Sequence, residues 1–124
     1  MPGVYISWPF CAQKCTYCNF ASGVFPKELE VSYAERLGLE IGAAEWPFLP
    51  ETVYLGGGTP SQMDDSVLAK VLGSIPGAPW VEATMEAAPG TFDSARIDGW
   101  RRAGINRVSL GVQSFVDSEL RRTG

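Results

Sequence analysis

The sequence predicts an α/β fold of four parallel βα units, arranged as the N-terminal half of a TIM-like barrel. Strand-like and helix-like segments alternate along the whole chain. Successive strand-like segments are separated by roughly the 30 residues of a βαβ unit. The length of 124 residues is half of the roughly 250 that a closed eight-unit barrel needs. We therefore expect residues 1–124 to be the N-terminal, truncated part of a larger barrel domain.

The first unit begins with Val4–Trp8, a short apolar segment rich in β-forming residues. A helix is expected from about Pro26, because proline suits the first helical turn, and it should end before Pro47. Apolar side chains at a spacing of four give this helix one buried face. They are Leu29, Tyr33, Leu37 and Ile41.

The second unit begins with a strand at Thr52–Leu55, which runs into the glycine motif Gly56-Gly57-Gly58-Thr59-Pro60. Asp64 or Asp65 can cap the next helix, since a carboxylate accepts the free N–H groups of a first turn. The turn at residues 76–79 ends this unit. Its expected buried side chains are Val67, Leu68, Val71, Leu72 and Ile75.

The third unit begins with a strand at Val81–Met85, in which apolar and polar residues alternate. Asp93 or Ser94 should open the following helix, and Gly104 should close it as a C-terminal cap. Ile97 and Trp100 are its apolar residues.

The fourth unit begins with a strand whose residues again alternate between two faces. A last helix is expected from about Asp117 and is cut off at Gly124. The apolar face has Val108, Leu110 and Val112, and the other face has Ser109, Gly111 and Gln113. Three tryptophans have no evident role besides packing, namely Trp46, Trp80 and Trp100.

The charge pattern excludes several classes of partner. Ten basic and fourteen acidic residues give a net charge of −4, without the basic patch that nucleic-acid binding requires. The N-terminus lacks the basic and apolar segments of a signal peptide. No apolar run approaches the roughly 20 residues of a membrane span. We expect no nucleic-acid partner, no membrane span and a cytoplasmic location.

Three cysteines, Cys11, Cys15 and Cys18, lie in one short segment directly after the first strand. An odd, clustered set does not form a disulfide framework, whereas thiolates are the soft ligands of iron–sulfur clusters. The chain has no other cysteine and no histidine, so a [4Fe–4S] cluster here would keep one iron open for a substrate. The alternatives are zinc or unligated buried cysteine, but structural zinc needs four ligands.

The other candidate motifs are ambiguous when taken alone. A glycine-rich strand end is often just a turn, although it also lets backbone approach a ligand closely. Glu82, Thr84 and Glu86 share one strand face, which alternation alone assigns to solvent. In a parallel barrel this face points inward, so a carboxylate near the carboxyl end of the strand could accept hydrogen bonds from a ribose. Gln113 is by default a surface glutamine.

Together these motifs resemble one family. The N-terminal segment, Tyr5-Ile-Ser-Trp-Pro-Phe-Cys11 followed by CxxxCxYC, is similar to the start of radical SAM enzymes. It resembles in particular the oxygen-independent coproporphyrinogen III oxidase-like branch, which includes the HemN oxidases and the HemW heme chaperones. Three further motifs follow in that family's order. They are GGGTPS at 56–61, EATMEAAPGT at 82–91 and GINRVSLGVQSF at 104–115.

The resemblance implies a [4Fe–4S] cluster and S-adenosylmethionine as cofactors, with reductive cleavage of the latter to a 5′-deoxyadenosyl radical. No side chain is needed as a general base. Gly57, Gly58 and Thr59 would hold the methionyl amino group, and Glu86 would contact the ribose. Further cofactor contacts, or residues that flank cluster and cofactor, would be Tyr5, Tyr17 and Gln113.

Two positions depart from the family pattern. Ser7 replaces the usual histidine, and Phe20 replaces the further cysteine of the oxidases. Phe20 therefore favours the heme chaperones, which bind heme and pass it to acceptor proteins such as respiratory enzymes. Porphyrinogen oxidation remains the alternative, with heme or a porphyrin as partner in either case. A third possibility is a non-functional fragment, because half of the barrel is missing.

Overall fold

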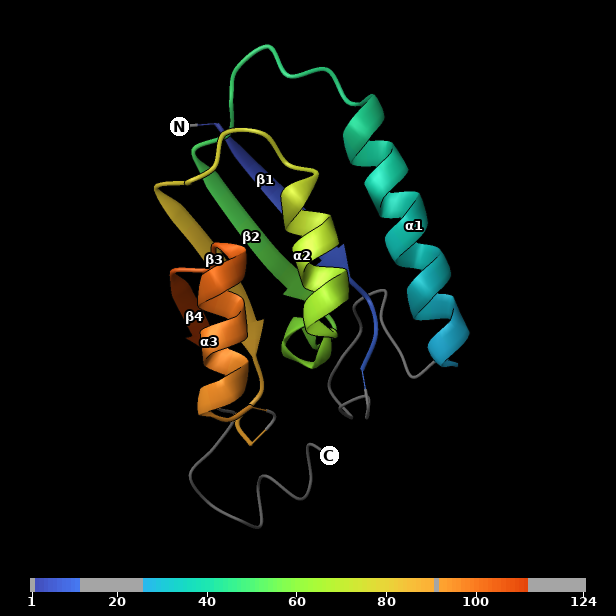
Figure 1. Cartoon of the computed structure of the whole chain (residues 1–124), viewed down its shortest axis with the longest axis vertical. Coiled ribbons are helices and arrows are strands. Elements are labelled where there is room, and N and C mark those ends of the chain that lie inside the picture. The colour runs from blue at the N-terminus through green and yellow to red at the C-terminus, as the bar shows by residue number, and fades with distance from the viewer. Residues whose placement is uncertain (1, 12–25, 91, 112–124) are drawn as a thin grey trace.

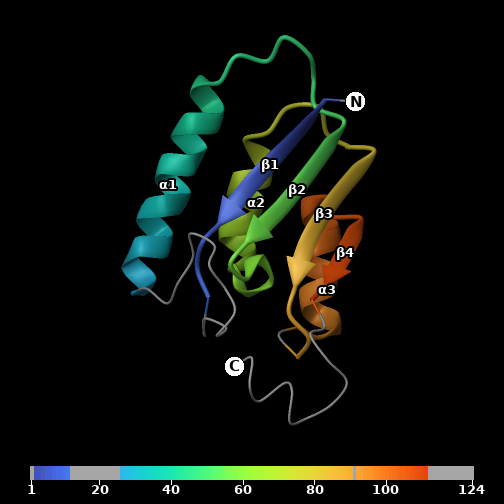
Figure 2. The same cartoon turned by 180° about the vertical axis from the view of Figure 1, so that it is seen from behind.

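The structure, a computed structural model that describes residues 2–11, 26–90 and 92–111, contains a four-stranded parallel sheet (Figure 1). The strand order β1-β2-β3-β4 follows the chain. The described helices all lie on one face of the sheet (Figure 2), as in one half of a (β/α) barrel. The predicted α/β fold with four parallel strands is confirmed. In chain order the elements are β1 (Gly3–Trp8), α1 (Lys27–Ala43), β2 (Thr52–Gly57), the 3-10 helix η1 (Pro60–Gln62), α2 (Asp65–Gly73), β3 (Glu82–Ala87), α3 (Ser94–Ala103) and β4 (Arg107–Leu110).

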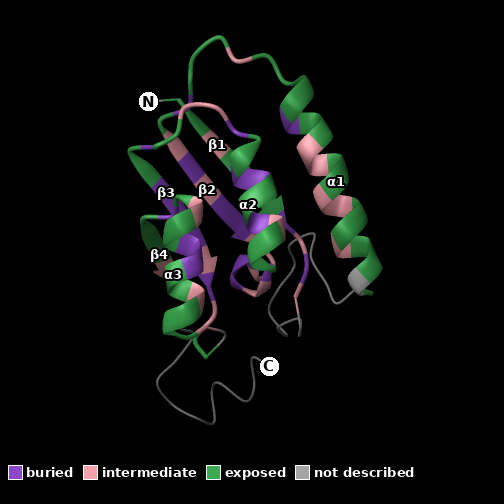
Figure 3. Cartoon of the chain, viewed as in Figure 1, coloured by how far each residue is buried: buried purple, intermediate pink, exposed green. Residues whose placement is uncertain are grey.

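The hydrophobic core lies between the sheet and the helices (Figure 3). Ile6, Leu55 and Met85 are paired in register across β1, β2 and β3, and each is buried. Helices α2 and α3 cover these strands with Leu68, Val71, Leu72 and Trp100. Full burial of each such aliphatic side chain is worth about 1.5–3 kcal/mol. Alternation along the strands leaves the polar residues on the opposite face, which no described helix covers.

The ends of α3 follow the predicted capping chemistry. Asp93 is the N-cap, and its Oδ1 accepts a hydrogen bond from the backbone N–H of Arg96 at 3.0 Å. Gly104 is the C-cap in the left-handed conformation, with φ of 114°. A Cβ at Gly104 would lie 3.0 Å from the Trp80 ring, so this position needs glycine for both conformation and space.

The predicted packing roles of the tryptophans and of Ile75 are confirmed. Trp80 and Trp100 are buried, and Trp46 packs against the core while partly buried. Ile75 lies beyond the end of α2 but is also buried. None of the described helices is long and apolar enough to cross a membrane.

Four expected core positions are wrong, each because nothing described lies over them. One of these is Val108 on β4, which is 38% exposed. Leu29, in the first turns of α1, is 48% exposed. Val81 precedes β3 rather than belonging to it and is 68% exposed. Leu110 lies on the edge strand β4 and is 55% exposed. The 3-10 helix η1, directly after the glycine motif, is an element that the apolar pattern did not predict.

Candidate cofactor site

The candidate site lies at the carboxyl ends of β1, β2 and β3, which point to the same edge of the sheet (Figure 2). The end of β1 leads to Cys11, the end of β2 is Gly57, and the end of β3 carries Glu86. Active sites of parallel α/β barrels form at this edge. Several predicted site residues lie outside the described residues, namely Cys15, Tyr17, Cys18 and Gln113, together with Phe20.

The Glu86 carboxylate is hydrogen-bonded at both of its oxygens. The Tyr54 hydroxyl donates to Oε2 at 2.8 Å, and the Gly57 N–H donates to Oε1 at 3.1 Å. Two donors from β2 therefore fix the carboxylate of β3. Each carboxylate oxygen can accept a second hydrogen bond, so the group can still receive two neighbouring hydroxyls such as those of a ribose.

Tyr5 and Tyr54 form a stacked pair on the same polar face of the sheet. Their ring centroids are 5.6 Å apart and the ring planes differ by 13°. Burial first, and then the hydrogen bond and negative charge of Glu86, raise the pKa of Tyr54 above its ordinary value of 10.0. Burial and the Glu86 charge raise the pKa of Tyr5 in the same way. Both hydroxyls therefore stay protonated at neutral pH and can act as donors.

The glycine motif is bonded to the segment that leads to Cys11. The N–H of Gly58 donates to the carbonyl of Trp8 at 2.6 Å, and the N–H of Thr59 donates to that of Phe10 at 2.9 Å. A Cβ at Gly58 would lie 2.6 Å from the Phe10 oxygen. The absence of a side chain at Gly58 is thus required by the close approach of this chain's own backbone.

The hydrogen bonds of the glycine motif determine which ligand groups it suits. The N–H groups of Gly57, Gly58 and Thr59 all donate to protein acceptors. What the backbone of this segment can offer a ligand is therefore carbonyl oxygen, which accepts hydrogen bonds from an ammonium group and repels a phosphate. The backbone of the motif is therefore suited to a ligand with an amino group and not to an anion, because binding an anion would require free backbone N–H groups.

An aromatic cluster supports the same segment from the helix side. The ring of Tyr33, on α1, packs edge to face against the rings of Trp8 and Phe10, which also pack edge to face against each other. The ring centroids are 4.9–5.7 Å apart. The Tyr33 hydroxyl also donates to the Ser7 carbonyl. Edge-to-face pairs of this kind add about 0.5–1.5 kcal/mol each to the energy of burial. The chain thus reaches Cys11 from a rigid, well-packed strand end.

Two residues beside the site, Tyr54 and Arg96, were not predicted from the sequence. Tyr54 could have been found, because it precedes Gly56 by two residues and so shares a strand face with it. Arg96 could not, because its Nη2 reaches the carbonyl of Ser61, 35 residues away, at 2.6 Å, and that of Met63 at 3.1 Å. Such a contact depends on how α3 packs beside η1, which local patterns do not encode.

Glu82 makes contacts within the sheet and none with Glu86 that the structure records. Its Oε1 lies 3.5 Å from Nη1 of Arg107, with both side chains about half exposed. The Thr84 hydroxyl donates to the same oxygen at 3.2 Å. Exposed ion pairs contribute about 0–1 kcal/mol, so this one joins β3 to β4 weakly and lies apart from Glu86.

The donor set fits an iron–sulfur cluster with a bound amino-acid-like ligand. Cys11 is a partly exposed free thiol, and thiolate is the ligand that iron–sulfur clusters use. Within the described ranges no group of three or more His, Cys, Asp or Glu residues could hold a metal ion. A ligand set for a cluster would therefore combine Cys11 with Cys15 and Cys18, which lie outside those ranges.

Comparison with known proteins shows the family of this chain. The sequence profile of the radical SAM superfamily matches residues 5–124. The chain belongs to the radical SAM superfamily. It is also similar in fold to coproporphyrinogen III oxidase (HemN) of Escherichia coli, a radical SAM enzyme, with a TM-score of 0.82 and 21% sequence identity. That match covers 99% of this chain and 31% of the oxidase chain.

Several curated relatives within this superfamily are heme chaperones. The HemW protein of Escherichia coli is 36% identical over 98% of this chain, and that of Synechocystis is 39% identical over 97%. Anaerobilin synthase of Escherichia coli O157:H7 is 38% identical over 96%. The chain spans 34%, 32% and 28% of these three proteins, respectively.

Proposed function

We propose that the chain is the N-terminal part of a radical SAM core domain, which binds a [4Fe–4S] cluster through Cys11, Cys15 and Cys18. S-adenosylmethionine would bind beside the cluster. Membership of the superfamily implies both groups. The observation that carries the proposal is the pair of backbone hydrogen bonds from Gly58 and Thr59, which place the glycine motif next to the segment that leads to Cys11.

The chain's own residues would bind and orient the cofactor rather than transfer protons. The carbonyl oxygens of Gly57, Gly58 and Thr59 would accept hydrogen bonds from its amino group. Glu86, fixed by Tyr54, would accept the ribose hydroxyls. Tyr5, Tyr17 and Gln113 are proposed as the remaining contacts. The chemistry that the two groups supply when bound is one-electron reduction of a sulfonium.

We further propose that the whole protein is a cytoplasmic heme chaperone, which delivers heme to acceptor proteins. Support comes from the HemW relatives at 36% and 39% identity and from Phe20, where the oxidases are expected to carry a cysteine. Since the chain spans about a third of these relatives, the activity belongs to the full-length protein. The clustered thiols suit a reducing compartment.

Oxygen-independent coproporphyrinogen III oxidation is the second candidate, and the fold similarity to HemN favours it. Anaerobic titration of the full-length protein with heme separates the two candidates. Saturable one-to-one heme binding without decarboxylation of coproporphyrinogen III supports the chaperone. Decarboxylation at enzymatic rates would replace it with the oxidase. The same titration on the 124-residue chain tests whether this part is functional alone.

A further inference from the structure

Arg96 connects helix α3 to the loop that follows the glycine motif. Its Nη2 donates to the carbonyls of Ser61 and Met63, at 2.6 and 3.1 Å. Ser61 is fully buried and Met63 is 1% exposed. A buried carbonyl without a donor is costly, and a cationic donor makes a stronger hydrogen bond than a neutral one. One guanidinium thus serves two carbonyls in and beside η1.

The loop held by Arg96 is bonded directly to the glycine motif. The N–H of Gln62 donates to the carbonyl of Thr59 at 3.0 Å. Thr59 in turn donates to Phe10, one residue before Cys11. A displacement of η1 would therefore move Thr59 and, with it, the contact between the glycine motif and the cysteine segment.

The same loop also contacts the strand that carries Glu86. The Ser61 hydroxyl accepts a hydrogen bond from the N–H of Ala88 at 3.4 Å, two residues after Glu86. Residues 59–63 thus lie between the ends of β2 and β3. The positions of Glu86 and of the glycine motif both depend on this loop.

The backbone of Arg96 is fixed in the first turn of α3, and its side chain is partly buried. Its backbone N–H donates to Asp93 at the start of α3, and its Nε is buried, with no partner among the described residues. Lysine has the same charge but places a compact ammonium on a different stem, so it cannot reproduce the planar donor group. We therefore expect lysine at this position to weaken the two hydrogen bonds that Nη2 donates to the carbonyls of Ser61 and Met63.

We propose that Arg96 is a positioning residue, which fixes residues 59–63 and through them the binding geometry for S-adenosylmethionine. The inference rests on the proposed function. Arg96 does not touch the cofactor in this proposal. It acts through η1 on the carbonyls of the glycine motif and on the end of β3.

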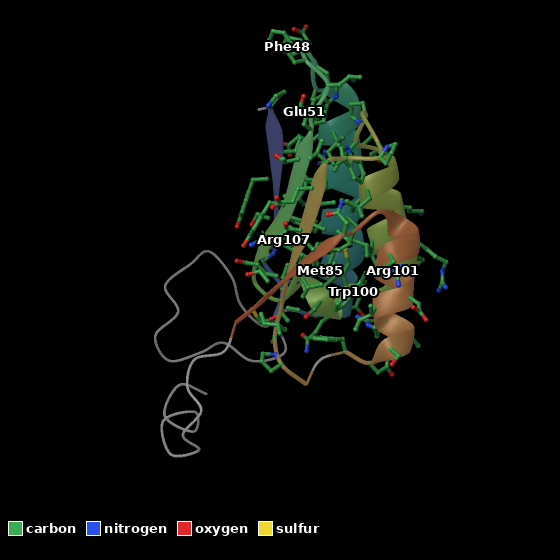
Figure 4. The ribbon with its side chains drawn as sticks, turned by 90° about the vertical axis from the view of Figure 1, so that its left-hand side faces the viewer. Phe48, Glu51, Met85, Trp100, Arg101 and Arg107 are labelled. Carbon is green, nitrogen blue, oxygen red and sulfur yellow. The ribbon has the colours of Figure 1, made fainter. Side chains whose placement is uncertain are left out.

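The test uses the full-length protein, reconstituted anaerobically with iron and sulfide, and compares R96M and R96K with wild type. Arg101 lies on an exposed face of the same helix (Figure 4), so R101M is the matched control. Isothermal titration calorimetry measures the Kd for S-adenosylmethionine at a temperature well below the Tm of each variant. Each titration is normalised to the concentration of chains that carry a cluster. Loss of a residue that orients the ligands of a metal typically costs about 10–100-fold in affinity or activity, and we take the same range for a residue that orients the groups around S-adenosylmethionine. We expect this loss in R96M, a smaller loss in R96K, unchanged cluster content in both, and wild-type affinity in R101M.

The outcomes separate the inference from the function on which it rests. Equal affinity of R96M and wild type, per cluster-loaded chain, overturns the role of Arg96. If R96M does not fold, R96K decides, and wild-type affinity in R96K overturns the role as well. A reconstituted wild-type protein that does not bind S-adenosylmethionine contradicts the proposed function instead.

Discussion

The backbone N–H of Gly57 donates a hydrogen bond to Oε1 of Glu86 at 3.1 Å. This bond joins the ends of β2 and β3 and brings together two motifs that are 29 residues apart in the sequence. Gly57 has φ of 105°, a conformation that side chains disfavour. The position of the Glu86 carboxylate therefore depends on glycine at residue 57, as well as on the Tyr54 hydroxyl.

Substitutions at Glu86 and Tyr54 should weaken S-adenosylmethionine binding to different extents. Glu86→Gln replaces a charged acceptor, and hydrogen bonds to charged groups are worth about 1.5–3 kcal/mol, or roughly 10–100-fold in Kd. Tyr54→Phe removes one orienting hydroxyl and should cost a few-fold. Titration calorimetry on the reconstituted full-length protein measures both. Glu82→Gln, on the same strand face, is the control and should bind as wild type.

The double variant tests whether Tyr54 acts through Glu86. Glu86→Ala removes the acceptor of the Tyr54 hydroxyl altogether, so Tyr54→Phe should have little further effect in a Glu86→Ala background and the two losses should not add. Simple addition of the two free-energy changes would show that Tyr54 acts independently of the carboxylate.

The tyrosine titration should respond to Glu86. Burial and the neighbouring carboxylate raise the pKa of Tyr54 and of Tyr5, so the folded pKa values lie above those of the unfolded chain. Their contribution to stability is therefore complete below the ordinary tyrosine pKa of about 10 and is lost as the pH rises through the raised values. Absorbance of tyrosinate against pH measures this directly. Glu86→Gln should lower the titration midpoints of Tyr5 and Tyr54. Unchanged midpoints would show that the Glu86 charge does not raise their pKa values.

Alanine at Gly58 should disrupt the site because the new Cβ would meet backbone. It would lie 2.6 Å from the Phe10 oxygen and 2.8 Å from the Trp8 oxygen. We expect Gly58→Ala to cost about 1–3 kcal/mol of stability, as overpacking typically does, and to impair cluster uptake. Gly38→Ala in α1 is the control, because no atom outside the neighbouring helix backbone lies within 4 Å of its Cβ position. That change should be neutral or stabilising by about 0.5–1 kcal/mol.

The N-cap of α3 gives a prediction about stability alone. Asp93→Ala removes the acceptor for the Arg96 N–H and should cost about 0.5–2 kcal/mol. Asp98→Ala, on an exposed position of the same helix, should cost much less. Urea unfolding monitored by far-ultraviolet circular dichroism compares the two variants. Equal losses would show that the Asp93 side chain does not cap the helix.

Local chemistry explains which parts of the fold were predictable from the sequence. Asp93 and Gly104 bound α3 because capping needs only the residues at the helix ends. Strand β3 was predicted from its alternation, although its start is shifted by one residue to Glu82. The exposure of Val81 and Leu110 was not predictable, since alternation shows which residues share a face but not whether another element covers that face.

The site was predictable to the extent that its residues lie within motifs. Glu86 and the glycine motif were identified from the family resemblance, and the structure brings them into direct contact. The donor to the other Glu86 oxygen, Tyr54, lies on a different strand. The use of the glycine N–H groups within the protein likewise depends on which strands are neighbours, which the sequence pattern alone does not specify.

The cysteine ligands can be tested one at a time. Cys11→Ser, Cys15→Ser and Cys18→Ser should each abolish or strongly reduce cluster incorporation, because a hard hydroxyl is a poor replacement for a soft thiolate. Iron and sulfide analysis after anaerobic reconstitution measures the loss. Ser7→Ala, upstream of the cysteine segment, is the control and should retain the cluster. Full incorporation in any of the three cysteine variants would remove that residue from the ligand set.

Electron paramagnetic resonance of the full-length protein tests the central proposal most directly. After anaerobic reconstitution with iron and sulfide, chemical reduction should give a paramagnetic signal from a [4Fe–4S] cluster. Addition of S-adenosylmethionine should shift that signal, because the cofactor is expected to bind at the open iron. Uptake of zinc in place of iron, or a reduced cluster whose signal does not change when S-adenosylmethionine is added, would contradict the proposal.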